Sequence, residues 1–367
     1  MSPGFASEID VTVVSAQGAV CAVDIRPRSR PAVIRLVAGK DVAVLRDVLP
    51  RLFALCARAH QLACACAIRA ARDEPLDGVR QRECHVALIR EWIGELLRGL
   101  HVAGLLSADG GALRDLMRLL AACGGDGRDD VGRQLGPALE RVGISISQGI
   151  ALPGSALARS LNAVEAMATM APAPAWLLSP EDDEDVVTAL FAHGEAFAGA
   201  PDLGGVVPET GAWSRQSLAR ARLAGHGPEP STSDPGAPGP SAAMRMKARI
   251  REIALLSAWL AGGDHDEGPV ADMVRSFRRS AGRGAAAVEC ARGRLYHAIE
   301  LGPRGEIVAF EFLAPTEWNF HRQGPLARAL GGMGIHGPQG RRSVEALVQS
   351  LDPCVGFQLR FRESAHA

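Results

Sequence analysis

Apolar residues follow two different periods along this chain, and the change of period marks the expected elements. Residues 8–26 alternate apolar and polar positions around a break at 16–18, which predicts a β-hairpin. Apolar residues then recur every three or four positions, which is typical of amphipathic helices. This second pattern predicts helices at 42–71, 79–106, 110–123, 130–143, 155–170, 183–198 and 241–261. Pro50 is expected to divide the first of these ranges into a short and a longer helix, because proline interrupts a helix interior.

The pattern changes again after residue 285. Two apolar runs, 288–295 and 307–313, predict strands joined by a turn at 301–305, and a helix is expected at 341–350. Helix dominates the chain, and the strands near its two ends suggest one small sheet. The expected fold class is therefore mainly α with a small β-sheet, which is an α+β protein.

A stretch rich in Pro, Gly and Ser at 226–240 interrupts the helical pattern. Such a composition favours a mobile loop, most simply a tolerated surface insertion, because it suits neither helix nor strand. We expect residues 1–225 and 244–367 to form the two parts of one large domain, with the loop at 226–243 between them.

Composition and charge narrow the possible functions. With 367 residues, of which 47% are hydrophobic, the chain can bury a sizeable core. Its 40 Lys and Arg residues balance 41 Asp and Glu residues, which argues against a nucleic-acid or acidic-membrane partner. The sequence begins without a signal-peptide pattern and contains no apolar run of about 18 residues that could span a bilayer, so a cytoplasmic protein is expected.

The chain contains eight cysteines and no C-x-x-C pair. A reducing compartment disfavours a disulfide framework, and the spacing argues against a zinc ribbon or a thioredoxin-like centre. Cys56 lies in an apolar helical stretch, and His60 shares its helix face, so the pair could bind a metal or could be core residues. Arg292 could equally be a surface arginine, and Asp352 with the following proline is a common turn signal.

Taken together, these segments resemble motifs of the nickel–iron (NiFe) hydrogenase large subunit. The N-terminal motif of that family has the form R-x-C-G-x-C-x-x-x-H. Arg51, Cys56 and His60 match its spacing, whereas Phe53 stands at the first cysteine and Ala54 at the glycine.

The C-terminal motif of the family has the form D-P-C-x-x-C-x-x-H/R. Asp352, Cys354 and Arg360 match it, whereas Phe357 stands at the second cysteine. Three further segments match in order: 209–215 resembles E-T-G-A-x-x-R, 289–297 resembles E-A-P-R-G-x-L-x-H, and 315–319 resembles P-S/T-x-W-N. Because the matches cover nearly the whole chain, the resemblance implies a helical core like that of the hydrogenase large subunit.

In that family, four thiolates hold a nickel and an iron, and the iron carries two cyanides and one carbon monoxide. Soft thiolates suit both metals, and anionic cyanides favour arginine and hydroxyl donors. The site residues that the resemblance implies are the metal ligands Cys56 and Cys354 and the cofactor-binding residues His60, Arg292, Pro315 and Thr316. Val355 and Phe357 would form an apolar wall for the carbon monoxide.

The departures from the family pattern argue against an enzyme. Phe53 and Phe357 replace two of the four cysteines, and nickel in this family needs the full set. The glutamate of the family's R-G-x-E segment, which passes protons, falls at Ile34. A site without two ligands and without its proton relay should not turn over hydrogen. What remains could hold the Fe(CN)2CO fragment without nickel.

This pattern resembles the hydrogenase maturation proteins of the HupK/HoxV type. The resemblance implies a non-catalytic scaffold or carrier that holds iron transiently as Fe(CN)2CO before its delivery to the hydrogenase large-subunit precursor. The expected partners are that precursor, a small HypC-like chaperone with an N-terminal cysteine, and other maturation proteins. Two alternatives stay open: a divergent hydrogenase or hydrogen-sensor large subunit, and a metal-free protein that assists hydrogenase assembly by contact alone.

Overall fold

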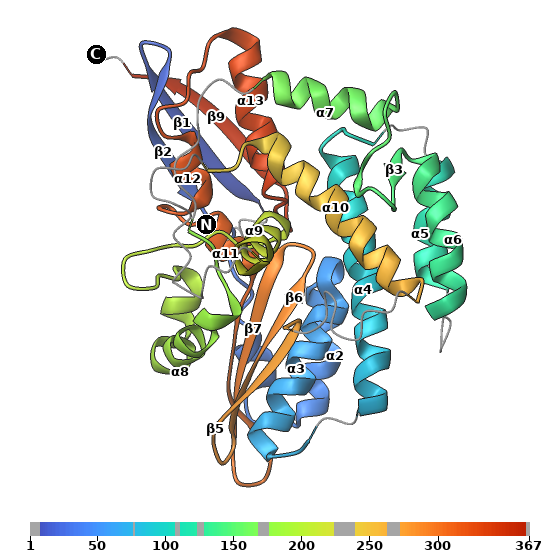
Figure 1. Ribbon diagram of the computed structural model, residues 1–367. Helices are drawn as coiled ribbons and strands as arrows, with labels where there is room; N and C mark the ends of the chain where they lie inside the picture. The colour runs from blue at the N-terminus through green and yellow to red at the C-terminus, as the bar shows by residue number, and fades with distance from the viewer. Residues whose placement is uncertain are drawn as a thin grey trace.

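Helices cover the faces of the larger of two main β-sheets, and the smaller sheet lies at the edge of the molecule (Figure 1). The computed structural model describes residues 8–75, 78–106, 111–122, 128–167, 176–223, 239–262 and 272–364. The helices are α1 Val33–Val37, α2 Val42–Leu52, α3 Ala57–Arg72, α4 Gly78–Val102, α5 Gly111–Ala122, α6 Arg128–Arg141, α7 Ala156–Ala166, α8 Asp183–Gly199, α9 Ala212–Leu223, α10 Ala242–Leu260, α11 Pro315–Asn319, α12 Pro325–Leu330 and α13 Gly337–Ser350, with short 3-10 helices η1 Ala54–Cys56 and η2 Pro180–Asp182. The strands are β1 Ile9–Ala16, β2 Ala19–Arg26, β3 Ile144–Ser145, β4 Ile150–Ala151, β5 Val274–Ser280, β6 Arg283–Cys290, β7 Gly293–Leu301, β8 Ile307–Leu313 and β9 Phe357–Glu363.

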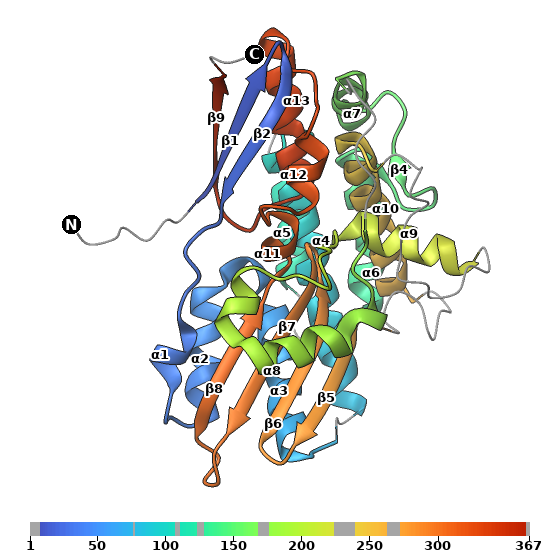
Figure 2. The same ribbon diagram turned by 90° about the vertical axis from the view of Figure 1, so that its left-hand side faces the viewer.

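The larger sheet is antiparallel, in the order β5-β6-β7-β8. Figure 2 shows α8 crossing one face of this sheet and α3 lying behind it. Helix α3 packs closely on β6 because small residues line both surfaces, with buried Ala63 and Ala67 on the helix and Gly284 and Ala286 on the strand. At Gly284 the approach is so close that an added β-carbon would lie 2.3 Å from the backbone nitrogen of Ala71.

This contact sets the position of the start of α3 relative to the end of β6. From Ala71 back to Cys56 the helix covers about 22 Å at ~1.5 Å per residue. From Gly284 to Cys290 the strand covers about 20 Å at ~3.3 Å per residue. Because Ala71 lies against Gly284, these matched lengths bring the start of α3 level with the end of β6.

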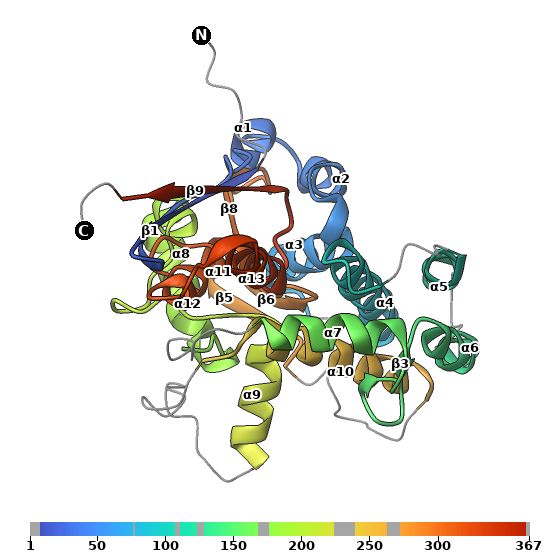
Figure 3. The ribbon, with the colours of Figure 1, turned by 90° about the horizontal axis from the view of Figure 1, so that it is seen from above.

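The smaller sheet joins the two ends of the described chain. Strand β1 pairs antiparallel with β2 and parallel with β9, from Ile9 beside Phe357 to Ser15 beside Glu363. The amide of Ile9 also donates to the carbonyl oxygen of Gly356 at 2.9 Å, which ties the turn before β9 to the start of β1. Seen from above (Figure 3), β9 lies along one side of the molecule, far from α5 and α6.

The predicted hairpin at 8–26 and the predominance of helix are confirmed, but Pro50 does not divide the first helical range. Helix α2 continues through Pro50 to Leu52, and the chain leaves the helical region at Phe53, with φ −122° and ψ 63°. A proline in the last turn removes a hydrogen bond only near the helix end, which α2 tolerates. The actual break therefore comes immediately before Cys56.

The predicted strand at 288–295 is wrong in its bounds. β6 ends at Cys290 and β7 begins at Gly293, so the predicted range spans a turn and places Arg292 within it. Gly293 has φ +133°, a backbone conformation that residues other than glycine rarely adopt. The pattern hid this turn because the residues from 284 to 299 are all buried, and continuous burial leaves no alternation to read.

The expectation of one small sheet is also wrong, because the strands of 288–313 pair among themselves and the N-terminal hairpin pairs with β9. The turn predicted at 301–305 does join β7 to β8. The loop predicted at 226–243 lies mostly outside the described residues, and the division into parts 1–225 and 244–367 stays a prediction. None of the helices in the described ranges is long and apolar enough to cross a bilayer.

Gly284→Ala should destabilise the protein, because the new methyl group would overlap the backbone of α3. Overpacking of this kind costs ~1–3 kcal/mol, and more where only backbone could give way. Urea unfolding followed by circular dichroism measures the loss. Gly199→Ala is the control, since nothing lies within 4 Å of its added β-carbon. Equal effects of the two substitutions would contradict the close contact between α3 and β6.

Candidate functional site

A cavity of about 220 Å³ lies where the ends of α3 and β6 meet the turn before β9. The residues that the sequence predicts as a site all line this cavity: Cys56, His60, Arg292, Pro315, Thr316 and Cys354. They come from four separate segments, so only the folded chain brings them together. Their roles toward a ligand stay predictions.

Cys56 is held at the N-cap position of α3, directly after the break that follows α2. The first amide groups of a helix lack partners within it. Glu91 of α4 provides the missing acceptor, because its carboxylate accepts the amide of Arg58 at 2.7 Å and that of Ala59 at 3.1 Å. The side chain of Cys56 makes no capping hydrogen bond, so its thiol can face the cavity.

His60 is buried one turn further along α3. Its Nδ1 atom lies 2.9 Å from Nε2 of His297 on β7, and its ring stacks on that of Phe53 with centroids 3.8 Å apart. Burial lowers the pKa of both histidines, that of His297 to about 3, so both rings are neutral at pH 7 and one donates to the other. His60 therefore has a histidine partner instead of the backbone carbonyl that an ordinary core histidine would use.

Arg292 reaches from the β6–β7 turn to α4 and to the turn before β9. Its Nε donates to the carbonyl oxygen of Asp352 at 3.1 Å, and its Nη2 donates to the carboxylate of Glu95 at 3.0 Å. Burial opposes the charged form, but Asp352 and Glu95 hold the pKa of Arg292 above its usual value. Nη1 is buried and has no hydrogen-bond partner among the described residues. Such an unpaired donor costs free energy that a bound acceptor would recover.

Cys354 lies in the turn between α13 and β9. The hydroxyl of Thr316 in α11 donates to its Sγ atom at 3.2 Å. The turn packs tightly on α4, where an added β-carbon at Gly99 would lie 2.6 Å from Oδ1 of Asp352. The glycine thus allows the close approach that places Cys354 at the cavity.

Burial favours the neutral thiol at Cys56 and at Cys290. Burial raises the pKa of Cys56 well above its usual value and that of Cys290 to about 12. Cys290 also lines the cavity, and its thiol donates to the carbonyl oxygen of Gly293 at 3.1 Å. A metal centre that binds here must therefore displace protons, which its positive charge makes favourable.

Two lining residues were not placed at the site by the sequence. They are Arg28, in the basic segment that follows β2, and Cys290, at the end of β6. The signal for Cys290 was its position two residues before Arg292. For Arg28, the only signal was the repeated arginines between prolines, which give no direction in space.

Several motif positions lie outside the cavity lining. Val355 lines it as expected, but Phe357 does not, because β9 begins there and its ring packs on the core of the smaller sheet. Arg51 and Arg360 are exposed, and Ile34 packs against the main core. The expected wall at Phe357 is therefore wrong: pairing of β9 with β1 carries this side chain away.

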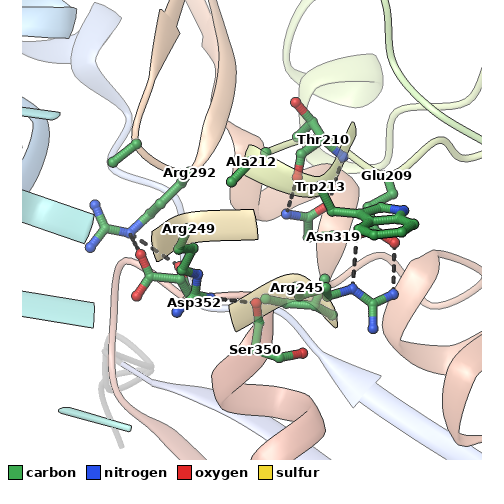
Figure 4. A pocket seen from close by; sticks show the side chains of 13 residues that line it. Glu209, Thr210, Ala212, Trp213, Arg245, Arg249, Arg292, Asn319, Ser350 and Asp352 are labelled. Carbon is green, nitrogen blue, oxygen red and sulfur yellow. Dashed lines mark hydrogen bonds and ion pairs between the residues drawn. The ribbon is translucent and has the colours of Figure 1, made fainter. Parts of the chain in front are cut away.

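Arg292 also lines a smaller polar pocket of about 20 Å³ (Figure 4). Glu209 and Arg245 form a doubly hydrogen-bonded ion pair there, at 2.7 and 2.8 Å. The side chain of Asn319 exchanges two hydrogen bonds with the backbone of Thr210. The motif segments 209–215 and 315–319 thus hold each other and α10 in place beside the cavity.

Comparison with known proteins identifies the family, although no family model matches the chain. The chain is 44% identical to the hydrogenase expression/formation protein HupK of Bradyrhizobium diazoefficiens over the full length of both. The chain belongs to this HupK family. It is also 32% identical to HupK of Rhizobium leguminosarum bv. viciae, over 98% of this chain and 97% of that one. The hydrogenase expression/formation protein HoxV of Cupriavidus necator is 33% identical over 58% of this chain and 53% of its own length.

Solved structures confirm the fold of this HupK-family chain. The Ni-Fe-Se hydrogenase of D. vulgaris Hildenborough matches with a TM-score of 0.61 at 12% identity, over 92% of this chain and 94% of that one. The Ni-Fe-Se hydrogenase of Desulfomicrobium baculatum matches with a TM-score of 0.59 at 15% identity, over 93% and 95%. The expected α+β fold, like that of the hydrogenase large subunit, is therefore correct.

Glu91→Leu should destabilise the start of α3, because the amides of Arg58 and Ala59 would lose their acceptor. Arg58 is exposed and Ala59 is buried, so the main cost should come from the Ala59 amide, at roughly 1–3 kcal/mol for a buried donor left unpaired. Glu91→Gln keeps one carbonyl oxygen at the same place and should cost less. Guanidinium unfolding compares the two variants, and a Gln variant as unstable as the Leu variant would show that the acceptor is not what matters.

Proposed function

We propose that this chain is a non-catalytic hydrogenase maturation factor that carries the Fe(CN)2CO fragment, as cargo, before its delivery to the hydrogenase large-subunit precursor. One observation carries the proposal: Cys56 and Cys354 line a single cavity together with Arg292, whose Nη1 atom is buried and has no hydrogen-bond partner in the described part of the chain. The relatives support a maturation role, because they are named hydrogenase expression/formation proteins.

The residues present fit this cargo. Two soft thiols can become iron ligands once the metal displaces their protons. The unpaired N–H of Arg292 suits the nitrogen of an anionic cyanide. Leu55, Leu295 and other apolar side chains suit carbon monoxide, which is a weak hydrogen-bond acceptor. A water needs roughly 10–15 Å³ of such space, so about 220 Å³ leaves room for an iron atom with three diatomic ligands.

The surroundings of Phe53 support a carrier without nickel. Its ring stacks on His60, meets the edge of Phe312 with centroids 4.9 Å apart, and is only 6% exposed. A well-packed ring therefore fills the position where the hydrogenase family has a thiolate. Within the described ranges no three His, Cys, Asp or Glu side chains converge as ligands for a bare ion. An iron that brings three diatomic ligands of its own needs fewer donors from the protein.

The cavity can be reached by a partner. Cys56 and Cys354 are only partly buried, and Leu52 in the same lining is 39% exposed. We propose that the N-terminal cysteine of a small HypC-like chaperone replaces these thiolates as a ligand of the iron, or is replaced by them. The hydrogenase large-subunit precursor and other maturation proteins are the further partners that we propose. Two thiolates retain iron less firmly than four, which suits a carrier.

Infrared spectroscopy tests the proposed cargo. Protein purified anaerobically from cells with the maturation machinery should show two cyanide bands and one carbonyl band, with iron and no nickel. Cys56→Ala and Cys354→Ala should each lose the bands, because a single thiolate cannot hold the fragment. Cys21→Ala, which removes an exposed cysteine, should keep them.

The same preparation separates the alternatives. Absence of the bands in wild-type protein would favour a metal-free assembly factor. Measurable nickel or hydrogen–deuterium exchange activity would instead favour a divergent hydrogenase or hydrogen sensor. Bands that survive in either cavity-cysteine variant would refute that cysteine as a ligand.

Arg292→Lys should weaken iron retention while leaving the fold largely intact. Lysine keeps a positive charge beside Glu95 and Asp352. Its single ammonium group cannot donate hydrogen bonds to both of these residues and to a ligand at the same time. Loss of one charge-assisted hydrogen bond should lower retention roughly tenfold or more. Iron content after gel filtration with a chelator measures this, alongside urea unfolding. Unchanged iron content and unshifted cyanide bands would contradict the role of Arg292.

A further inference from the structure

Arg28 brings a second guanidinium to the cavity, and its surroundings leave that group without a hydrogen bond. The side chain is only 14% exposed and lines the same cavity as Cys56 and Cys354. Its one ion-pair partner among the described residues is Glu317, at 4.0 Å, which is too far for a hydrogen bond. Nε of Arg28 is buried and has no partner in that part of the chain.

Arg30, two residues later, provides the contrast. Its Nη2 donates to the carboxylate of Glu311 at 2.7 Å and to the carbonyl oxygen of Phe312. Its Nε lies 3.6 Å from Glu317 and, like Nε of Arg28, has no hydrogen-bond partner among the described residues, so the two arginines differ in the hydrogen bonds of their terminal nitrogens. Arg30 is absent from the cavity lining. One short segment therefore holds an arginine with structural partners and an arginine whose donors are unmatched.

The charge of the cargo calls for a second cation. Ferrous iron contributes two positive charges, two cyanides and two thiolates contribute four negative ones, and carbon monoxide contributes none. The bound fragment without nickel thus carries two negative charges into a partly buried site. Burying them is costly unless opposite charges and hydrogen bonds meet them. Arg292 and Arg28 are the arginines in the lining, which is otherwise free of charged side chains.

We propose that Arg28 is a second cyanide-recognising residue, donating to one cyanide of the fragment while Arg292 donates to the other. This inference rests on the proposed function and adds to it. Thr316 was the residue expected to share this role, but its hydroxyl is directed at the Sγ atom of Cys354. The unmatched donors of Arg28 fill the role that Thr316 leaves open.

Two separate arginines give the site a way to select its cargo. An iron with a single cyanide would leave one guanidinium with an unpaired buried N–H, which costs free energy. A site with buried donors rejects a ligand that lacks the matching acceptor far better than an apolar site does. Arg28 therefore favours the complete dicyano fragment over an unfinished one.

Arg28→Met, with Arg30→Met as the matched control, tests the proposal in full-length protein purified anaerobically from cells with the maturation machinery. Arg28→Met removes a charge-assisted hydrogen bond to one cyanide. One cyanide band should therefore shift to lower frequency or disappear. Iron should also be lost to a chelator roughly tenfold faster or more. Arg30→Met should keep both bands in place. Arg28→Lys keeps the charge without the planar fork, so it should shift the same band and lose iron at an intermediate rate.

Wild-type bands and wild-type iron loss in Arg28→Met would overturn the role of Arg28 while leaving the proposed carrier intact. Equal shifts in Arg28→Met and Arg30→Met would also overturn it, because the effect would then pass through Glu317, which both arginines face. If circular dichroism shows that Arg28→Met does not fold, the Arg28→Lys variant becomes the test. Cyanide bands at their wild-type frequencies in Arg28→Lys would then overturn the proposal. Absence of bands in wild-type protein would instead remove the proposed function and this inference together.

Discussion

The hydrogen bonds of Arg292 connect three segments that are far apart in the sequence. They join the β6–β7 turn to Glu95 on α4 and to Asp352 in the turn that carries Cys354. Removing one partner of a buried charge is costly, so these segments stay together. Two nitrogens of Arg292 serve this structure, and Nη1 has no hydrogen-bond partner among the described residues, so the residue that joins the cavity walls keeps an unused donor. Cys56 arrives at the same place by a different route, the close packing of α3 on β6.

Buried arginines elsewhere in the chain show how structural guanidinium groups are satisfied. Arg215 reaches Glu252 and Glu289 with bonds near 2.7 Å, and Arg294 binds Asp183 and Glu289. These groups have carboxylate partners on more than one side, and they fix how helices and strands pack against one another. At the cavity, Arg28 differs from them because none of its nitrogens makes a hydrogen bond to a carboxylate of the described residues.

The sequence predicted most of the long helices and six residues that line the cavity, because apolar periodicity and motif spacing are local signals. The helix α9 was not predicted. It failed where the deciding contact is distant. The turn at Arg292 was invisible because β6 and β7 are buried on both faces. β9 was missed because it is defined by its pairing with β1, and Phe357 was misplaced for the same reason. Arg28 carried no signal, since a basic segment after a strand reads as a solvated turn until the cavity beside it is known.

The parallel pairing of β9 with β1 makes the site depend on the order in which the chain is synthesised. Ile9 leaves the ribosome early, and its strand keeps an open edge until Phe357 and the residues after it are made. Only then does Gly356 bind Ile9 and hold the turn that carries Cys354. The last wall of the cavity is thus also the last to be translated. A chain that stops before Cys354 would lack one of the cavity thiols and would leave the edge of β1 unpaired.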